Sequence, residues 1–366
     1  AIITSYSPYR PFTSIQESGL YIKELENSEL TYEKKHELNI GADMGFLNNR
    51  INLAVDWYKR NNYDLIGIVN TQGAGGQILK YANIASMKSH GIEFTLSTKN
   101  IKTKDFNWNT DFIFSNAKNE VTDLKQNANV MELISGNGFA KQGYPVRGLF
   151  SIPFVGLDKD GIPVIINEKG EATSTDINFQ ERQNTGFLKY EGPTDPTITG
   201  SLGNMFSYKG FRLNLFITYS FGNVIRLNPV FKAYYSDLTA MTREFKNRWT
   251  LPGDEAKTNV PAILSKRMYD SNEDLKYAYN AYNYSTERIA KGDFIRLKEI
   301  SLAYDFPKAW INPLKLTDLS LKVQATNLFL IYADDKLNGQ DPEFFNAGGV
   351  ASPVPRQFTI TLRLGL

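Results

Sequence analysis

The sequence of 366 residues contains no cysteine, which excludes disulfide bonds and thiolate metal sites. It has no run of about 20 consecutive apolar residues, which a transmembrane helix requires, so a helical membrane protein is excluded. Neither sign of charge predominates, because 41 Lys and Arg residues balance 39 Asp and Glu residues. No basic run of the kind that binds nucleic acid occurs, and we predict no nucleic-acid partner.

The sequence also lacks the motifs of common catalytic and metal sites. His36 and His90 are the only histidines, and neither has the spacing of a metal-ligand motif. We interpret both as polar residues near strand ends. There is no Gly-x-Ser-x-Gly elbow, no phosphate-binding Walker motif and no paired-carboxylate set. We therefore predict that the protein is not an enzyme and that it uses no cofactor or metal.

One acidic segment resembles the start of a calcium-binding loop. It consists of Asp158, Lys159, Asp160 and Gly161. The twelfth position of such a loop holds a bidentate Glu, but here that position is Lys169. Because Asp and Gly supply turn geometry without any ion, we predict a hairpin turn.

What the sequence does contain is long alternation of apolar and polar residues. In the final segment, large apolar residues take every second position from Phe358 to Leu366, with Thr359, Thr361 and Arg363 between them. A side-chain period of two places the apolar residues on one surface of a strand. Transmembrane barrels combine such strands with low overall hydropathy, here a mean of −0.35, because half of each strand and the loops are polar. The pattern therefore predicts a strand with lipid on one side.

The alternation predicts about nine strands, each near the 9 to 11 residues that a tilted membrane strand needs. Asn48 and Asn49, which suit tight hairpins, separate the first pair. The predicted strands are residues 37–46, 51–58, 91–98, 106–115, 197–207, 211–221, 294–305, 319–332 and 357–366.

Short connections between the predicted strands alternate with long ones. Outer-membrane barrels have short periplasmic turns and long extracellular loops. This parity places the C-terminus in the periplasm and the residues before Glu37 outside. A barrel cannot begin there, so we expect an incomplete barrel. The predicted long loops are residues 61–87, 116–196, 222–293 and 333–355.

Several segments together resemble the SusC/RagA-type TonB-dependent transporters, the outer-membrane nutrient importers of Bacteroidota. The first is HELNIGADMGFLNNRINLAVDWYKRNNYDLI at residues 36–66, and the last is the DPE at residues 341–343. The resemblance implies an all-β fold: the C-terminal portion of a large antiparallel transmembrane β-barrel of about 22 strands. Residues 1–366 would be one partial barrel, without the plug domain and the N-terminal strands. The segments between these two are YPVRGLFSIPFVGLDKDGIPVIINEKGE, TDPTITGSLGNMFSYKGFRLNLFITYSFG, NRWTLPGD, GDFIRLKEISLAYDFP and ATNLF.

The resemblance also implies a function and partners. The chain would be the barrel part of an integral protein of the cell outer membrane that imports an oligomeric nutrient, a glycan or a peptide, with TonB-derived energy. Its partners would be a SusD-like surface lipoprotein acting as a lid, the remainder of the same barrel and its plug, the TonB complex through the absent N-terminal part, and outer-membrane lipid. The alternative from a different class is a soluble secreted β-protein that binds carbohydrate.

The predicted loop at residues 222–293 is rich in aromatic residues. Tyr and Trp on loops make rigid surfaces for sugar rings or peptides, but the same rings can pack the loop against its neighbours. Both interpretations stay open. The candidate substrate- or lid-binding residues are Tyr234, Tyr235, Trp249, Tyr277, Tyr279, Tyr282 and Tyr284.

Overall fold

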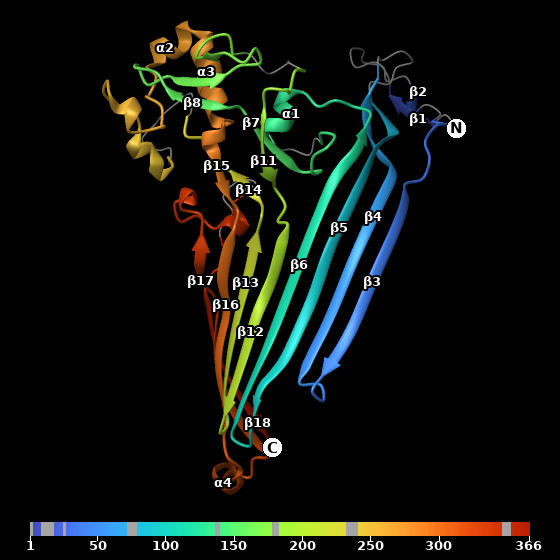
Figure 1. Cartoon of the computed structure of the whole chain (residues 1–366), viewed down its shortest axis with the longest axis vertical. Coiled ribbons are helices and arrows are strands. Elements are labelled where there is room, and N and C mark those ends of the chain that lie inside the picture. The colour runs from blue at the N-terminus through green and yellow to red at the C-terminus, as the bar shows by residue number, and fades with distance from the viewer. Residues whose placement is uncertain are drawn as a thin grey trace.

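The main element of the computed structural model is one antiparallel sheet of nine strands (Figure 1). The structure describes residues 3–8, 18–24, 27–71, 79–135, 140–177, 183–231, 241–345 and 353–366. The nine strands follow one another across the sheet in chain order. They are β3 (Lys34–Phe46), β4 (Ile51–Asn70), β5 (Leu79–Lys102), β6 (Phe106–Leu124), β12 (Ile198–Tyr208), β13 (Phe211–Phe221), β16 (Phe294–Asp305), β17 (Asp318–Ala333) and β18 (Gln357–Gly365).

All of the strands predicted from the alternation are present, so the all-β, antiparallel fold is confirmed. No helix in the described part of the chain is both long and apolar enough to span a membrane. The sheet ends at β3 on one side and at β18 on the other, and within the described residues these two strands are not paired with each other. The total of 22 strands for a complete barrel stays a prediction.

The predicted long loop at residues 61–87 was wrong, because β4 and β5 continue through it and remain paired as far as Asn70 and Leu79. The ladder contains an irregularity between Asn62 and Ile66, where Asp64 has a positive φ of 55°. A bulge shifts the alternation of side chains, so the period-two pattern is interrupted although the strand is not.

The register of the ladders gives the sheet one apolar and one polar face. Residues directly opposite each other share a face, and Leu362, Leu321 and Tyr304 follow one another across three strands. The same row continues through Phe211 to Tyr208. On the other side lie rows such as Thr361–Lys322–Ala303–Arg212 and Thr359–Gln324–Ser301–Asn214. The alternation seen in single strands thus becomes a continuous apolar face.

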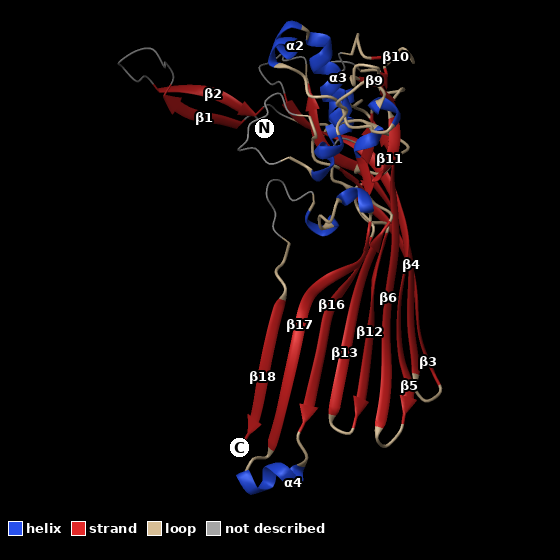
Figure 2. Cartoon of the chain, turned by 90° about the vertical axis from the view of Figure 1, so that its left-hand side faces the viewer, coloured by secondary structure: helices blue, strands red, loops and turns tan. Residues whose placement is uncertain are grey.

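The short connections lie together at one end of the sheet, with the C-terminus (Figure 2). Leu47, Asn48 and Asn49 all have positive φ values near 55°, which confirms the predicted Asn turn. Between β16 and β17 the connection is longer and contains α4 (Lys308–Ile311) and η4 (Asn312–Leu314).

A glycine in β12 makes room for an aromatic ring of the next strand. Tyr219 pairs with Gly200 and donates its hydroxyl to the Ile113 carbonyl oxygen at 2.9 Å, across β12. A Cβ at position 200 would clash with both groups, whereas a Cβ at Gly203 would meet nothing closer than 3.7 Å.

We expect Gly200→Ala to destabilise the sheet by about 1–3 kcal/mol, because Tyr219 must move and loses its hydrogen bond. Gly203→Ala in the same strand is the matched control, and we expect it to be neutral or slightly stabilising. Thermal unfolding of the detergent-solubilised protein measures both. Equal effects of the two substitutions would contradict this explanation.

At the other end of the sheet, the long connections fold into a compact loop unit (Figure 1). We define it as the described parts of residues 125–197, 222–293 and 334–345. A separate hairpin, β1 (Ile3–Pro8) and β2 (Ser18–Glu24), precedes β3. The loop unit contains α1 (Val130–Ser135), β7 (Gly148–Ser151), β8 (Phe154–Leu157), β9 (Pro163–Ile166), β10 (Ala172–Thr173), β11 (Lys189–Pro193), β14 (Val224–Arg226), η1 (Arg243–Asn247), η2 (Asp254–Ala256), α2 (Lys266–Ser271), α3 (Glu273–Asn283), η3 (Thr286–Arg288), β15 (Ile289–Lys291), η5 (Asp335–Leu337) and η6 (Pro342–Phe344).

Candidate functional site

The loop unit has a hydrophobic core of its own. Segments far apart in sequence meet in it, because α1 and β7 pack against α3. The fully or nearly fully buried residues of this core are Val130, Leu133, Ile134, Phe150, Ile152, Ile165, Ile177, Leu188, Ala278 and Ala281. The long loops are therefore a packed structure that holds its surface residues in fixed positions.

Helix α3 places two of the candidate aromatic residues in the interior. Asn272 caps the helix by accepting hydrogen bonds from the backbone N–H groups of Asp274 and Leu275. Positions three, four and seven residues apart share one face of a helix, and Leu275, Tyr279 and Tyr282 form such an inward stripe. Both tyrosines are 0% exposed.

The buried tyrosines contact other parts of the loop unit. The Tyr279 hydroxyl donates to the Ala262 carbonyl oxygen at 2.8 Å, and its ring lies 4.7 Å from that of Phe231. The Tyr282 ring meets Phe154 edge to face at 5.4 Å, and burial raises the pKa of its hydroxyl above the usual value. Loop packing thus accounts for both rings in this structure.

The other candidate aromatic residues are placed differently. Tyr277 and Tyr284 are half-buried and pack against the edge of the same core. Tyr234 and Tyr235 lie outside the described residues. The binding role of the seven candidates stays a prediction. Among the described members, Tyr277, Tyr284 and Trp249 are the residues that are partly exposed.

Trp249 stacks on the turn between β8 and β9. A Cβ at Gly161, whose φ is 76°, would lie 2.6 Å from the Trp249 ring, and the indole N–H donates to Glu255 at 2.9 Å. Asp158 shapes this turn by accepting hydrogen bonds from the N–H groups of Asp160 and Ile162, both at 2.9 Å. The predicted hairpin turn at Asp158 is confirmed.

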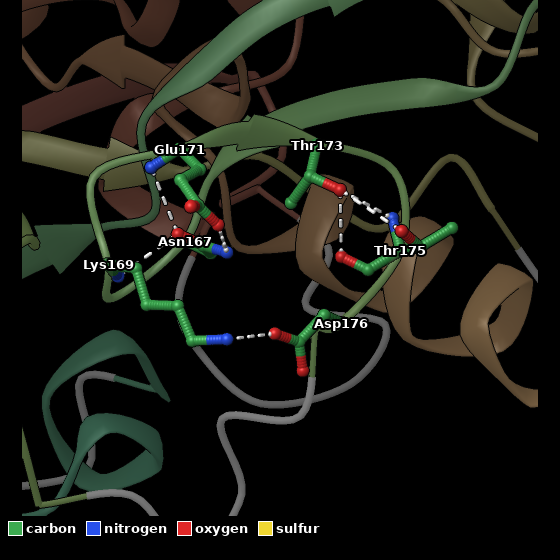
Figure 3. Close-up of polar contacts among 6 residues, drawn as sticks. All are labelled: Asn167, Lys169, Glu171, Thr173, Thr175 and Asp176. Atoms are coloured by element: carbon green, nitrogen blue, oxygen red, sulfur yellow. Dashed lines mark hydrogen bonds and ion pairs between the residues drawn. The ribbon is translucent and has the colours of Figure 1, made fainter.

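The next hairpin, between β9 and β10, is closed by its own side chains (Figure 3). The Asn167 side chain accepts hydrogen bonds from the N–H groups of Lys169 and Glu171, both at 3.0 Å. Lys169 forms an ion pair with Asp176 at 2.6 Å, which raises the pKa of the lysine. Since these polar groups already bind one another, we assign them a structural role.

Two arginines, the buried Arg288 and the half-buried Arg226, connect segments of the loop unit. Arg288, 1% exposed, forms a bidentate pair with Glu244, 20% exposed, at 2.8 and 2.7 Å. Burial lowers the pKa of Arg288, but the Glu244 pair outweighs this and the net pKa is raised. Arg226 donates to the Phe150 carbonyl oxygen at 2.5 Å, and burial lowers its pKa to about 10.

A large cavity in the described residues lies where the loop unit meets the polar face of the sheet. Its volume is about 1100 Å³. Arg296 of β16 forms part of the wall beside Asp341, and the bulged segment at Asn327 and Leu328 of β17 contributes another part. Phe231, Phe344 and Phe345 supply apolar surface. The cavity can accommodate a ligand larger than a single sugar or amino acid.

A buried ion network fixes this wall. Arg296 donates to Asp341 at 2.5 Å and lies 3.2 Å from Glu343. Asp341 also caps η6 by accepting the Glu343 N–H at 3.1 Å. Residues 341–343 are the DPE segment, so this motif attaches the last long loop to β16.

Comparison with curated proteins gives relatives of one kind, although no family model matches the chain. TonB-dependent receptor P3 of Formosa agariphila is 25% identical over 93% of the chain, which corresponds to 34% of that protein. TonB-dependent receptor P39 of the same organism is 26% identical over 100% of the chain and 38% of its own length. TonB-dependent receptor SusC of Bacteroides thetaiotaomicron is 26% identical over 93% of the chain and 32% of its own length.

Solved structures share the fold over the whole chain. The RagAB peptide transporter matches with a TM-score of 0.73 and 23% identity, covering 100% of this chain and 38% of that chain. The open-open state of the RagAB peptide importer matches with a TM-score of 0.75 and 22% identity, with the same coverage. The resemblance to the SusC/RagA-type TonB-dependent transporters is confirmed. This SusC/RagA-like chain spans about a third of the length of the curated relatives it matches.

The fold explains why the motifs of this SusC/RagA-like chain are spaced as they are. The segment NRWTLPGD contains Trp249, whose ring lies against Gly161 in the Asp158 turn. It also contains Asp254, whose carboxylate accepts a hydrogen bond from the Leu251 N–H and so closes a turn within the segment. GDFIRLKEISLAYDFP and DPE meet through Arg296 and Asp341. The buried arginine pairs were not found from the sequence. The sequence signal that could have indicated the Arg296 pair is a charged residue within an otherwise apolar strand segment, Phe294 to Leu297.

Proposed function

We propose that this chain forms part of the wall of an outer-membrane transporter that imports an oligomeric nutrient with TonB-derived energy, beneath a SusD-like lid. The observation that carries the proposal is the cavity of about 1100 Å³ at the junction of the polar face and the loop unit. A pathway needs a polar inner wall, an apolar outer wall and a substrate site at its entrance. The similarity to SusC and to the fold of the RagAB transporter supports the same function.

In this proposal the apolar face contacts lipid and the short turns lie in the periplasm together with the C-terminus. Strands β3 and β18 pair with the remainder of the barrel, because an unpaired strand edge in lipid costs several kcal/mol per backbone group. The plug and the TonB contact belong to that remainder. The long loop at residues 222–293 lies on the extracellular side, where a lid lipoprotein closes over it.

The orientation of the last strand can be tested by substitution. We expect Leu362→Arg to reduce stability by about 2–4 kcal/mol, since it places a charge toward the middle of the bilayer. Thr359→Arg, on the opposite face beside Gln324, is the matched control and should be tolerated. The amount of folded, heat-modifiable protein in outer-membrane fractions measures both. If Leu362→Arg were tolerated and Thr359→Arg were damaging, the face of β18 that carries Thr359 would be the one in contact with lipid.

Transport itself is tested in the source bacterium. Deletion of the gene should abolish growth on one class of oligomeric nutrient, peptide or glycan, and a protonophore or loss of TonB should abolish uptake in the wild type. Uptake that continues without TonB would contradict the proposed energy source. A protein released into buffer without detergent would favour the alternative, a soluble carbohydrate-binding protein.

A further inference from the structure

We propose that a row of basic side chains on the apolar face of the sheet, at the end next to the loop unit, binds the phosphate groups of a lipid headgroup. This inference rests on the proposed function, which places the apolar face in the lipid of the outer membrane. The row crosses β4, β5 and β6, which lie side by side in the sheet (Figure 1). It is separate from the transport pathway, which lies on the polar face.

The register of the ladders brings the basic residues together. Lys59 of β4 lies directly opposite His90 of β5, and His90 lies directly opposite Lys118 of β6. Residues that are directly opposite share a face, with Cβ atoms about 5 Å apart. The two lysines are therefore separated by two strand spacings, about 10 Å, with the histidine between them. All three residues are exposed.

The row lies at the border of the apolar face. No register shift occurs between His90 and Phe94 in β5, so His90, Ile92 and Phe94 point to the same side. The next row toward the middle of the sheet holds Ile40, Trp57 and Ile92, which are all exposed. Trp is favoured at the depth of lipid headgroups. The cations thus lie about 7 Å beyond the first apolar row, at the expected level of the headgroups.

The two lysines have no counter-charge in the part of the chain that the structure describes. Neither Lys59 nor Lys118 forms an ion pair or a side-chain hydrogen bond there. Glu120, which lies in the following row, is already paired with Lys88 at 3.0 Å. Exposed cations without acidic neighbours at a lipid surface favour an anionic partner.

The basic residues are specific to one end of the apolar face. At the opposite end of β3 to β6, the last row of this face carries no cation and consists of Phe46, Ile51, Thr98 and Thr110. The end that carries the lysines is the one next to the loop unit. In the proposed orientation that end lies at the outer leaflet, so the partner is a lipid of the outer leaflet.

A phosphorylated lipid matches this surface better than a free anion does. A lipid presents its phosphates at headgroup level and its acyl chains directly below, where Trp57 and Ile92 lie below the cations. Lysine ammonium groups and an imidazole N–H donate hydrogen bonds to phosphate oxygens. A headgroup that carries more than one phosphate can contact both lysines across the width of β5.

The test uses the full-length transporter in detergent, after its bound lipid has been washed away. The probes are bisphosphorylated lipid A and the same lipid after dephosphorylation, and native mass spectrometry measures the lipid that is retained. The variant is Lys59→Ala with Lys118→Ala. Both side chains are exposed and unpaired, so their removal should not weaken the fold. Lys99→Ala, an exposed lysine on the polar face of β5, is the matched control.

We expect the wild type and Lys99→Ala to bind bisphosphorylated lipid A equally. The double variant should bind it about 25-fold more weakly, because each lysine at an anionic lipid surface contributes about fivefold. Dephosphorylated lipid A should bind weakly to all of these proteins. Unchanged binding by the double variant, or equal binding of the two lipids by the wild type, would overturn the inference. Displacement of lipid A by an equal concentration of inorganic phosphate would identify a free-phosphate site and would also overturn it.

Failure of this inference is distinguishable from failure of the proposed function. If the basic row does not bind phosphorylated lipid, TonB-dependent uptake by the wild type is unaffected and the proposed function stands. A protein that retains neither lipid and remains in buffer without detergent would instead refute the proposed function.

Discussion

Glu244→Ala is expected to destabilise the loop unit by about 3–5 kcal/mol, because it leaves the guanidinium of Arg288 buried without its counter-charge. Arg288 is 1% exposed and donates two hydrogen bonds to Glu244, at 2.8 and 2.7 Å, and a third to the Asn228 carbonyl at 2.7 Å. Those contacts join η1 and η3 to the start of the same long loop. Their loss should release residues 241–288 from the core.

Limited proteolysis of the folded transporter measures this effect as earlier cleavage within residues 222–293. The matched control is Asp195→Ala, which breaks the exposed pair with Arg147 and should change stability by no more than about 1 kcal/mol. If both variants were cleaved at the same rate as wild type, the buried pair would not hold the loop unit together.

Tyr279→Ala is expected to cost a similar amount, about 3–5 kcal/mol, because it empties the space of a fully buried ring. It also removes the hydrogen bond to the Ala262 carbonyl oxygen. Tyr279→Phe keeps the ring and should cost only about 0.5–1.5 kcal/mol. Met268→Ala, at an exposed position of the neighbouring helix α2, is the control, with an expected change within about 0.5 kcal/mol.

Thermal unfolding of the loop unit, monitored by near-ultraviolet circular dichroism, measures the stability of the three variants. A Tyr279→Ala protein as stable as Met268→Ala would show that the α3 stripe does not hold the loop unit together. Because Tyr279 and Tyr282 are buried, replacing them would disturb packing before it reported on binding. The half-buried Tyr277 and Tyr284 are therefore the members of the aromatic set on which the binding hypothesis is best tested.

The sequence by itself determined the strands of the sheet and the separation of their faces. Alternation in segments such as Phe358–Leu366 depends only on the period of a strand, which is local and the same in every sheet. The turn at Asn48 and Asn49 was equally local, since it depends on residues that tolerate positive φ. The alternation missed the outer ends of β4, β5 and β6, which extend beyond the predicted strands. In β4 the bulge at Asp64 interrupts the period.

Tertiary structure decided which residues of the long loops are interior and which line a cavity. The sequence left open whether Tyr279 and Tyr282 bind a ligand or pack the loop. In the structure α3 turns both inward, and its direction depends on contacts with α1 and β7, more than a hundred residues earlier. The Arg288–Glu244 and Arg296–Asp341 pairs join positions 44 and 45 residues apart. No local pattern encodes such a pair, because the cost of burying each charge is offset only when the folded chain brings its partner beside it.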